Sequence, residues 1–247
     1  MKRWILSIIF SIFIVSSGEC YEIFEIKHKG KKQVVHYDLV MPKKVTIEKL
    51  PVLVCVGGLH LTNGVYYHSD PRECTGKKWE GFAQKNQIAV LGLGFKHDSD
   101  DWKNKESYQY AQAWSGKALK RLLRQLSRKH SLDPNKLMLF GVSAGAQFSV
   151  RYAFYNHKDV LAVAAHAAGG YDKPKKFIKT KFLITVGSED NAEVSRVDWA
   201  KFFVKHARDK AIDVRPVVIE GLAHRQTEEQ NQMSREFFTE ALREKAR

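Results

Sequence analysis

The sequence predicts an α/β domain with a mostly parallel sheet of about eight strands and helices on both faces. Three observations support this fold class. Short continuous apolar runs, typical of strands buried on both faces, alternate with longer segments of helical periodicity. A G-x-S-x-G pattern, Gly141 to Gly145, stands between one such run and one such helix. Polar or glycine-rich segments follow the strands, whose carboxyl ends meet at one edge of a parallel sheet.

The expected elements follow one another without a low-complexity linker, which indicates one domain over residues 19–247. Alternating apolar and polar residues give the first two expected strands, residues 21–28 and 32–41. Short apolar segments give the other expected strands, which are residues 51–56, 88–93, 136–140, 160–165, 182–186 and 214–219. Apolar residues at helical spacing give the expected helices, which are residues 79–85, 106–130, 146–154, 191–210 and 228–245. The first two strands form a hairpin around Lys29-Gly30-Lys31. Residues 167–181 alone separate the sixth strand from the seventh, which leaves room for only a minimal lid.

The first residues have the pattern of a secretory signal peptide. A basic pair at residues 2–3 precedes an apolar run over residues 4–15, and Ser16 and Gly18 suit the −3 and −1 positions of a cleavage site. The apolar run is short for a membrane span. We therefore expect residues 1–18 to be removed.

The mature chain is then expected to be secreted or periplasmic, without stable membrane insertion after cleavage. An uncleaved anchor is less favoured than export. A lipoprotein modified at Cys20 is also less favoured, because Glu19 fits a lipidation site poorly.

The chain is strongly basic, with a formal net charge of +14 at pH 7. Removing residues 1–18 takes away Lys2 and Arg3 and no acidic residue, so +14 becomes +12. Cations of the longest expected helix alternate with leucines at helical spacing, as on a solvated helix face. They are Lys117, Lys120, Arg121, Arg124, Arg128 and Lys129. Since no zinc-finger, RNP or helix-turn-helix pattern accompanies them, no nucleic-acid partner is expected.

Three cysteines do not form a disulfide framework. Cys55 lies in an expected strand and Cys74 in a polar loop. An exported chain allows either a Cys55–Cys74 or a Cys20–Cys74 bond, and the sequence does not choose between them.

The G-x-S-x-G pattern predicts that Ser143 is a nucleophile on a tight strand–turn–helix. Such a turn forces strained backbone angles on the serine, so its neighbours must be small. Gly141 and Gly145 allow the strand and helix to cross closely. The N–H of Ala144 is then expected to point to where an oxyanion forms.

A serine hydroxyl is a poor nucleophile near neutral pH and needs a base that an acid orients. Asp190 follows the seventh strand and His224 follows the last, which gives the chain order Ser, Asp, His. Glu189 is the alternative acid. The structural alternatives are a helix N-cap for Asp190 and an exposed loop histidine for His224.

With these residues in place, the chain resembles the α/β-hydrolase superfamily from about Tyr21 to the C-terminus. The segment from Gly141 to Gly170 is similar to secreted esterases of the polyhydroxybutyrate-depolymerase and feruloyl-esterase type, and to dienelactone-hydrolase-like and prolyl-oligopeptidase-like proteins. The resemblance implies the α/β-hydrolase fold, with Ser143 as nucleophile, His224 as general base and then acid, and Asp190 as its orienting acid. It implies no cofactor.

The glycines that follow the third strand in this superfamily match Gly57 and Gly58, but the histidine that often precedes them is Val56 here. A backbone donor does not depend on that side chain. The resemblance therefore places the second oxyanion N–H at Gly58 or Leu59.

Other residues of the polar loops have weaker signals. Four potential metal ligands match no zinc spacing such as H-E-x-x-H, so we expect solvated residues or substrate contacts and no metal. They are His60, His68, His97 and Asp98. The four tryptophans beyond the predicted signal peptide are expected to pack in the core or between helices rather than to bind sugars. They are Trp79, Trp102, Trp114 and Trp199.

The sequence thus predicts an exported serine hydrolase that cleaves carboxylic esters through an acyl-enzyme. The expected substrate is a small-molecule or polymeric ester. With a minimal lid the site is expected to be open, which suits a bulky or polymeric acyl donor more than a small buried lipid. A prolyl-oligopeptidase-like serine peptidase is one alternative, although no large substrate domain is present. A non-catalytic binding protein of this fold, with its basic surface on anionic glycans or membranes, is the other. The oligomeric state stays open.

Overall fold

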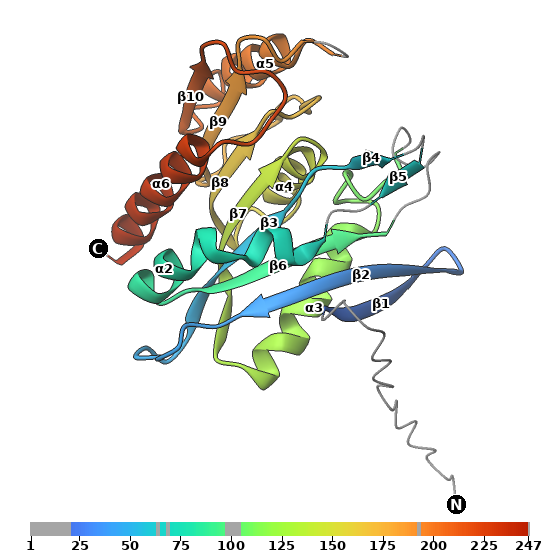
Figure 1. Cartoon of the computed structure of the whole chain (residues 1–247), viewed down its shortest axis with the longest axis vertical. Coiled ribbons are helices and arrows are strands. Elements are labelled where there is room, and N and C mark those ends of the chain that lie inside the picture. The colour runs from blue at the N-terminus through green and yellow to red at the C-terminus, as the bar shows by residue number, and fades with distance from the viewer. Residues whose placement is uncertain (1–20, 63–64, 68–69, 97–104, 192–193, 247) are drawn as a thin grey trace, which may run out of the picture.

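An eight-stranded sheet in the order β1-β2-β6-β3-β7-β8-β9-β10 runs through the molecule (Figure 1). The structure is a computed structural model that describes residues 21–62, 65–67, 70–96, 105–191 and 194–246. The strands of this sheet are β1 (Glu22–His28), β2 (Lys31–Val40), β3 (Leu50–Val56), β6 (Ala89–Phe95), β7 (Leu132–Val142), β8 (Val160–His166), β9 (Lys181–Gly187) and β10 (Val214–Ile219). The predicted mostly parallel sheet of about eight strands is confirmed.

The first two strands run differently from the rest. β2 is antiparallel to both β1 and β6, whereas β6, β3, β7, β8, β9 and β10 are parallel neighbours. Lys29 and Gly30 turn the first hairpin with φ angles of 48° and 78°. The six parallel strands therefore end at one edge of the sheet, where their loops meet.

Helices cover both faces of the sheet. One face carries α3 (Ser115–Lys129), α4 (Ala144–Tyr155) and α5 (Arg196–Arg208), and the other carries α1 (Pro71–Thr75), α2 (Lys77–Asn86) and α6 (Glu228–Ala246). In Figure 1, α2 and α6 lie on the viewer's side, and α3 lies behind β2.

Alternate side chains of the central strands supply two separate apolar layers. Val52, Val54 and Val56 of β3 pack with the first group of helices, whereas Leu53 and Cys55 pack with the second. Because successive side chains of a strand point to opposite faces, a strand covered on both sides must be apolar throughout. This explains the continuous apolar run that predicted it.

The longest predicted helix begins later than its periodicity indicated. Residues 105–114 form turns, and α3 starts at Ser115. The indole of Trp114 donates to the carbonyl of Glu106 at 2.9 Å, and the hydroxyl of Ser115 donates to the carbonyl of Tyr108 at 2.5 Å. These bonds, and the burial of Tyr108 and Trp114 against Phe95, replace the first helical turns.

The polar segment after β3 contains structure that periodicity did not reveal. A short hairpin, β4 (His60–Thr62) with β5 (Val65–Tyr67), precedes α1. Asp70 caps α1 by accepting the N–H of Arg72 at 2.8 Å, and Pro71 starts the helix. The disulfide Cys55–Cys74 then joins α1 to β3, with the Cα atoms 5.6 Å apart. Of the two pairings that the sequence allowed, the structure forms this one.

Two further observations concern the termini and the lid. The predicted signal peptide and Cys20 lie outside the described residues. Within the described part of the chain, no helix is long and apolar enough to span a bilayer. Residues 167–180, between β8 and β9, form no helix, which confirms the predicted minimal lid.

The predicted burial of the tryptophans is met by some of them only. Trp79 and Trp114 are buried as predicted, Trp102 lies outside the described residues, and Trp199 on α5 is 38% exposed.

Candidate active site

Ser143 occupies the turn between β7 and α4. Its backbone angles, φ 53° and ψ −115°, lie in a region that residues with a side chain rarely adopt. Its N–H donates to the carbonyl of His166 at 2.8 Å. Its carbonyl accepts the N–H groups of Ala146 and Gln147 at 3.1 and 3.2 Å. These bonds fix the strained residue at the carboxyl edge of the sheet.

The two glycines of the pattern are required by close backbone contacts. A Cβ atom on Gly141 would lie 2.4 Å from the carbonyl oxygen of Gly145. A Cβ atom on Gly145 would lie 2.1 Å from the carbonyl oxygen of Val56. Neither distance is tolerable, so the start of α4 can cross the ends of β7 and β3 only where side chains are absent.

The side chains of Ser143, His224 and Asp190 lie in hydrogen-bond contact. Nε2 of His224 is 3.2 Å from the hydroxyl oxygen of Ser143, and Nδ1 is 2.9 Å from Oδ2 of Asp190. When Nδ1 carries the proton and donates it to the carboxylate, Nε2 is free to accept from the serine hydroxyl. Glu189, the alternative acid, is exposed and makes no such bond. The structure thus brings together the three residues that the sequence singled out.

Backbone contacts hold the two loops that carry the acid and the imidazole. A Cβ atom on Gly187, where β9 ends, would lie 1.9 Å from the carbonyl oxygen of Leu222. The N–H of Gly221 donates to the hydroxyl of Ser188 at 2.9 Å. Gly221 itself has a φ of 66°, which suits glycine. These contacts place the loop after β10 directly beside the loop after β9.

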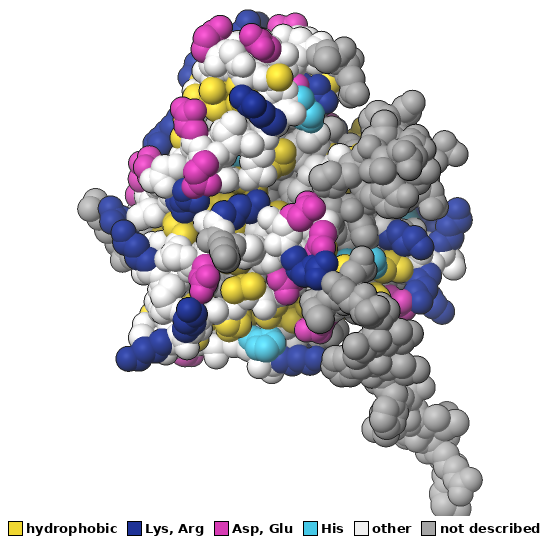
Figure 2. Space-filling view, viewed as in Figure 1, with side chains coloured by type: hydrophobic (Ala, Val, Ile, Leu, Met, Phe, Trp, Pro, Cys, Tyr) yellow, Lys and Arg dark blue, Asp and Glu magenta, His cyan; other side chains and the backbone are white. Residues whose placement is uncertain are grey.

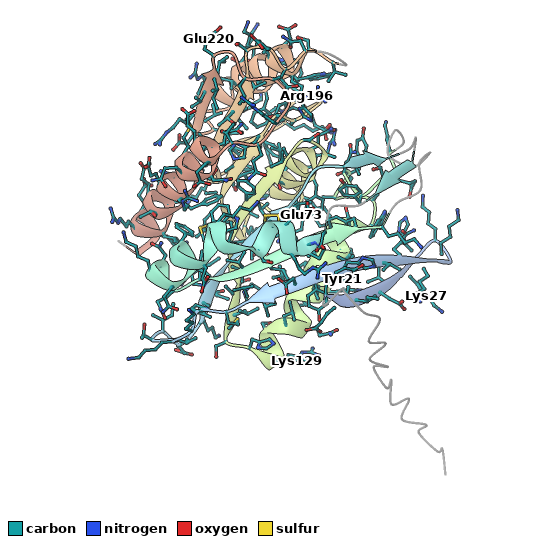
Figure 3. All side chains as sticks on the ribbon, viewed as in Figure 1. Tyr21, Lys27, Glu73, Lys129, Arg196 and Glu220 are labelled. Atoms are coloured by element: carbon teal, nitrogen blue, oxygen red, sulfur yellow. A yellow bond between two sulfur atoms is a disulfide. The ribbon has the colours of Figure 1, made fainter. Side chains whose placement is uncertain are left out.

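Asp190 has a second partner that sequence reasoning missed. Nη1 of Arg196 donates to Oδ1 of Asp190 at 3.1 Å, and the two side chains are 8% and 1% exposed. Arg196 is the first residue of α5, and Figure 3 shows it at the same end of the molecule as Glu220, which follows β10. No spacing or motif marks this arginine, because its bond to Asp190 is seen only in the folded chain.

The backbone beside Ser143 offers hydrogen-bond donors. A Cβ atom on Gly58 would lie 3.4 Å from Cβ of Ser143, so the chain of the Gly58-Leu59 segment passes next to the nucleophile. Ala144 is the first residue of α4, and the first N–H groups of a helix have no acceptor within it. The positive end of the helix dipole adds to their attraction for negative charge.

A buried histidine lies beneath the nucleophile. Nδ1 of His166 is 2.6 Å from the hydroxyl oxygen of Thr185, and Nε2 is 2.9 Å from that of Ser234. The hydroxyl of Ser234 donates to the carbonyl of Gln230, and the amide of Gln230 donates to Thr185. Burial, with a contribution from the charge of Lys78, lowers the pKa of His166 to about 3. The ring is therefore neutral, with its proton on Nε2.

The described residues include no group of three or more His, Cys, Asp or Glu side chains that could hold a metal ion. Of the loop residues considered as ligands, His68, His97 and Asp98 lie outside the described residues. The backbone of His60 belongs to β4.

No protein-family model matches the chain, and no curated protein matches its sequence. Solved structures of hydrolases nevertheless resemble it closely in fold. A poly(3-hydroxybutyrate) depolymerase from Bordetella parapertussis has a TM-score of 0.61 at 17% identity, over 90% of this chain and 90% of that one. An S-formylglutathione hydrolase from Agrobacterium tumefaciens has a TM-score of 0.62 at 13% identity, over 93% of this chain and 96% of that one.

A poly(aspartic acid) hydrolase from Sphingomonas sp. KT-1 shows the same relationship. It has a TM-score of 0.61 at 17% identity, over 88% of this chain and 98% of that one. These likenesses cover between 88% and 93% of this chain. The chain therefore has the α/β-hydrolase fold.

Proposed function

We propose that the protein is an exported serine hydrolase that cleaves carboxylic esters through an acyl-enzyme. One observation carries the proposal. The hydrogen-bonded series from Asp190 through His224 to Ser143 ends on a serine held in a strained turn at a helix N-terminus. A nucleophile, a base in reach of it and an acid that orients the base are the parts that acyl transfer by serine requires.

In the first half of the reaction, Oγ of Ser143 attacks the acyl carbon while its proton passes to Nε2 of His224. The carboxylate of Asp190 stabilises the imidazolium that forms. The carbonyl oxygen becomes an oxyanion, which the N–H groups of Ala144 and of Gly58 or Leu59 stabilise. The imidazolium then gives its proton to the leaving alkoxide, and the acyl group stays on Ser143.

In the second half, water replaces the alcohol. His224 removes a proton from the water as it attacks the acyl carbon of the ester on Ser143. The second oxyanion collapses, the bond to Oγ breaks, and the imidazolium returns its proton to Ser143. The carboxylic acid leaves and the enzyme regains its initial state.

The surroundings of the site favour a bulky or polymeric ester. The connection between β8 and β9 has no helix that could cover Ser143. The depolymerase among the similar structures is named for a polyester, poly(3-hydroxybutyrate). A nucleophile that no helix of this connection covers can reach an ester bond within a chain that does not fit a closed pocket.

Two features support export. Residues 1–18 have the pattern of a cleavable signal peptide. The Cys55–Cys74 disulfide is of a kind that persists in oxidising compartments and is rare in the cytosol.

The test compares the mature parent with Ser143→Ala on 4-nitrophenyl acetate. Loss of the nucleophile is expected to lower turnover by about 10⁶-fold. Ser149→Ala is the matched control, because Ser149 is a fully buried serine of α4, the helix that follows Ser143, and its hydroxyl has no partner among the described residues. It should retain the parent rate. A fluorophosphonate probe should label the parent and Ser149→Ala, but not Ser143→Ala.

The other outcomes distinguish the alternatives. Near-parent hydrolysis by Ser143→Ala would contradict the proposal. Cleavage of aminoacyl amides, with esters turned over more slowly, would favour a peptidase. Folded parent protein that neither hydrolyses esters nor reacts with the probe would favour a binding protein of this fold.

A further inference from the structure

Arg196 is bonded to the acid of the candidate site from the side opposite the imidazole. Oδ1 of Asp190 accepts Nη1 of Arg196 at 3.1 Å, and Oδ2 accepts Nδ1 of His224 at 2.9 Å. Each carboxylate oxygen therefore has its own charged or chargeable partner. The partners come from two elements, the start of α5 and the loop after β10.

Because Asp190 is buried, its carboxylate depends on the hydrogen bond from Arg196. Asp190 is 1% exposed, so water cannot supply the hydrogen bonds that an ionised carboxylate needs. A buried carboxylate without a donor either takes up a proton or turns toward another partner. A guanidinium is always charged and has a fixed planar geometry, which suits it to hold a buried carboxylate in one orientation.

We propose that Arg196 is a positioning residue of the active site, which fixes Oδ1 of Asp190 so that Oδ2 faces Nδ1 of His224. This inference rests on the proposed function for its catalytic consequence. The bond to Arg196 prevents the carboxylate from rotating away from the imidazole.

The orientation matters because the proton must be on Nδ1. When Oδ2 accepts the Nδ1 proton, Nε2 is left to accept the proton of Ser143. Without a fixed carboxylate, the imidazole samples other orientations and the wrong tautomer. The chemical step slows, whereas binding of a small ester changes little.

The first experiment measures steady-state kinetics of Arg196→Met on 4-nitrophenyl acetate, with active sites counted by fluorophosphonate labelling. We expect kcat to fall by about 10- to 100-fold, as when the hydrogen-bond partner that orients a metal-binding histidine is removed. KM should change by less than about twofold, since the interaction acts on the chemical step. Arg196→Lys should recover part of kcat, because it restores a cation.

The second experiment has a readout that does not need activity. A proton shared between Nδ1 of an imidazole and a carboxylate gives a far-downfield ¹H NMR signal, which His224→Gln assigns by its loss. In Arg196→Met this signal should shift upfield or disappear through exchange with water. If the parent shows the signal but hydrolyses no ester, the proposed function fails while the NMR comparison still decides the role of Arg196.

Arg151→Met is the matched control. Arg151 is also a buried arginine, with its side chain 6% exposed and Nε donating to Asp172 at 3.1 Å, and it has no bond to the three site residues. We expect this variant to lose stability while kcat per labelled site and the downfield signal stay as in the parent. Equal effects of the two substitutions on both readouts would mean that loss of any buried arginine explains the result, and would overturn the inference.

If Arg196→Met does not fold, Arg196→Gln replaces it in both experiments. Its neutral amide ends short of the position of Nη1, so we expect a lowered kcat and a shifted signal here too. A folded Met or Gln variant with the parent's kcat and an unchanged downfield signal would overturn the inference.

Discussion

At the scale of single residues, the candidate site depends on glycines, where a side chain would not fit, as much as on the side chains of its reactive residues. Ser143 can reach the sheet edge only because Gly145 brings α4 against the carbonyl of Val56, and Gly187 lets the His224 loop lie against β9. These glycines carry no chemistry. They let the backbone segments that carry Ser143, Asp190 and His224 come close enough for these side chains to form hydrogen bonds.

The buried His166 makes folding stability depend on pH. Its pKa is lowered from 6.5 to about 3, chiefly by burial. Between these values the unfolded chain binds a proton that the folded protein does not, so falling pH favours unfolding. The contribution is present in full above about pH 6.5 and is lost at about 1.4 kcal/mol per pH unit as pH falls toward 3. Urea unfolding at pH 7, 6 and 5 measures it.

His166→Gln isolates this contribution from those of other titrating groups. The amide is expected to lower stability at pH 7, because it cannot reproduce both bonds to Thr185 and Ser234. Between pH 6 and 5, however, its free energy of unfolding should fall less than that of the parent, by about 1.4 kcal/mol. Equal slopes in the two proteins would mean that the folded protein protonates His166 normally.

At the scale of elements, the disulfide ties the loop that passes the nucleophile. Cys55 lies near the end of β3, just before the Gly57-Gly58 segment, and Cys74 lies 19 residues further along the chain, in α1. Closing a loop of this length is expected to stabilise the fold by about 3 kcal/mol, mainly by restricting the unfolded chain. Cys55→Ala with Cys74→Ala should therefore lower the free energy of unfolding in urea by about that amount.

Reductant provides the control for this prediction. The parent should lose a similar stability in dithiothreitol, whereas the double variant should not respond to it. Each single substitution should cost about as much as the double one, because either breaks the bond. A reductant-insensitive parent would show that the two sulfurs are not joined in solution.

The elements also show what a sequence can predict of this fold. Strands such as β3 and β9 were predicted within a residue or two, since burial on both faces leaves a continuous apolar run. The start of α3 was not, because Tyr108 and Trp114 are held by packing against Phe95 rather than by local periodicity.

The same distinction applies to the site. Ser143, Asp190 and His224 follow predictable strands, in the chain order Ser, Asp, His that the G-x-S-x-G pattern leads one to expect. Arg196 did not stand out, because an arginine at the start of an amphipathic helix looks like any surface cation. Only the folded structure shows that its side chain is buried and bonded to Asp190.

At the scale of the whole molecule, the chain carries an excess of positive charge. On the face shown in Figure 2, Lys and Arg side chains are interspersed with Asp and Glu, and no single basic patch dominates. A net charge of +14, or +12 without residues 1–18, nevertheless produces a positive potential that extends beyond any one side chain. Such a field acts on the approach of charged substrates and not on the chemistry at Ser143.

This field predicts how salt affects the proposed hydrolysis. For an anionic ester, the 4-nitrophenyl monoester of succinic acid, kcat/KM should fall by about tenfold as sodium chloride rises from about 10 mM to about 500 mM, because screening weakens long-range attraction. Methyl 4-nitrophenyl succinate is its neutral match and should be affected little. Steady-state kinetics on both esters across this range tests the prediction. The same salt dependence for the two would show that the field is too weak at the site to attract substrate, and that the positive charge acts elsewhere on the surface.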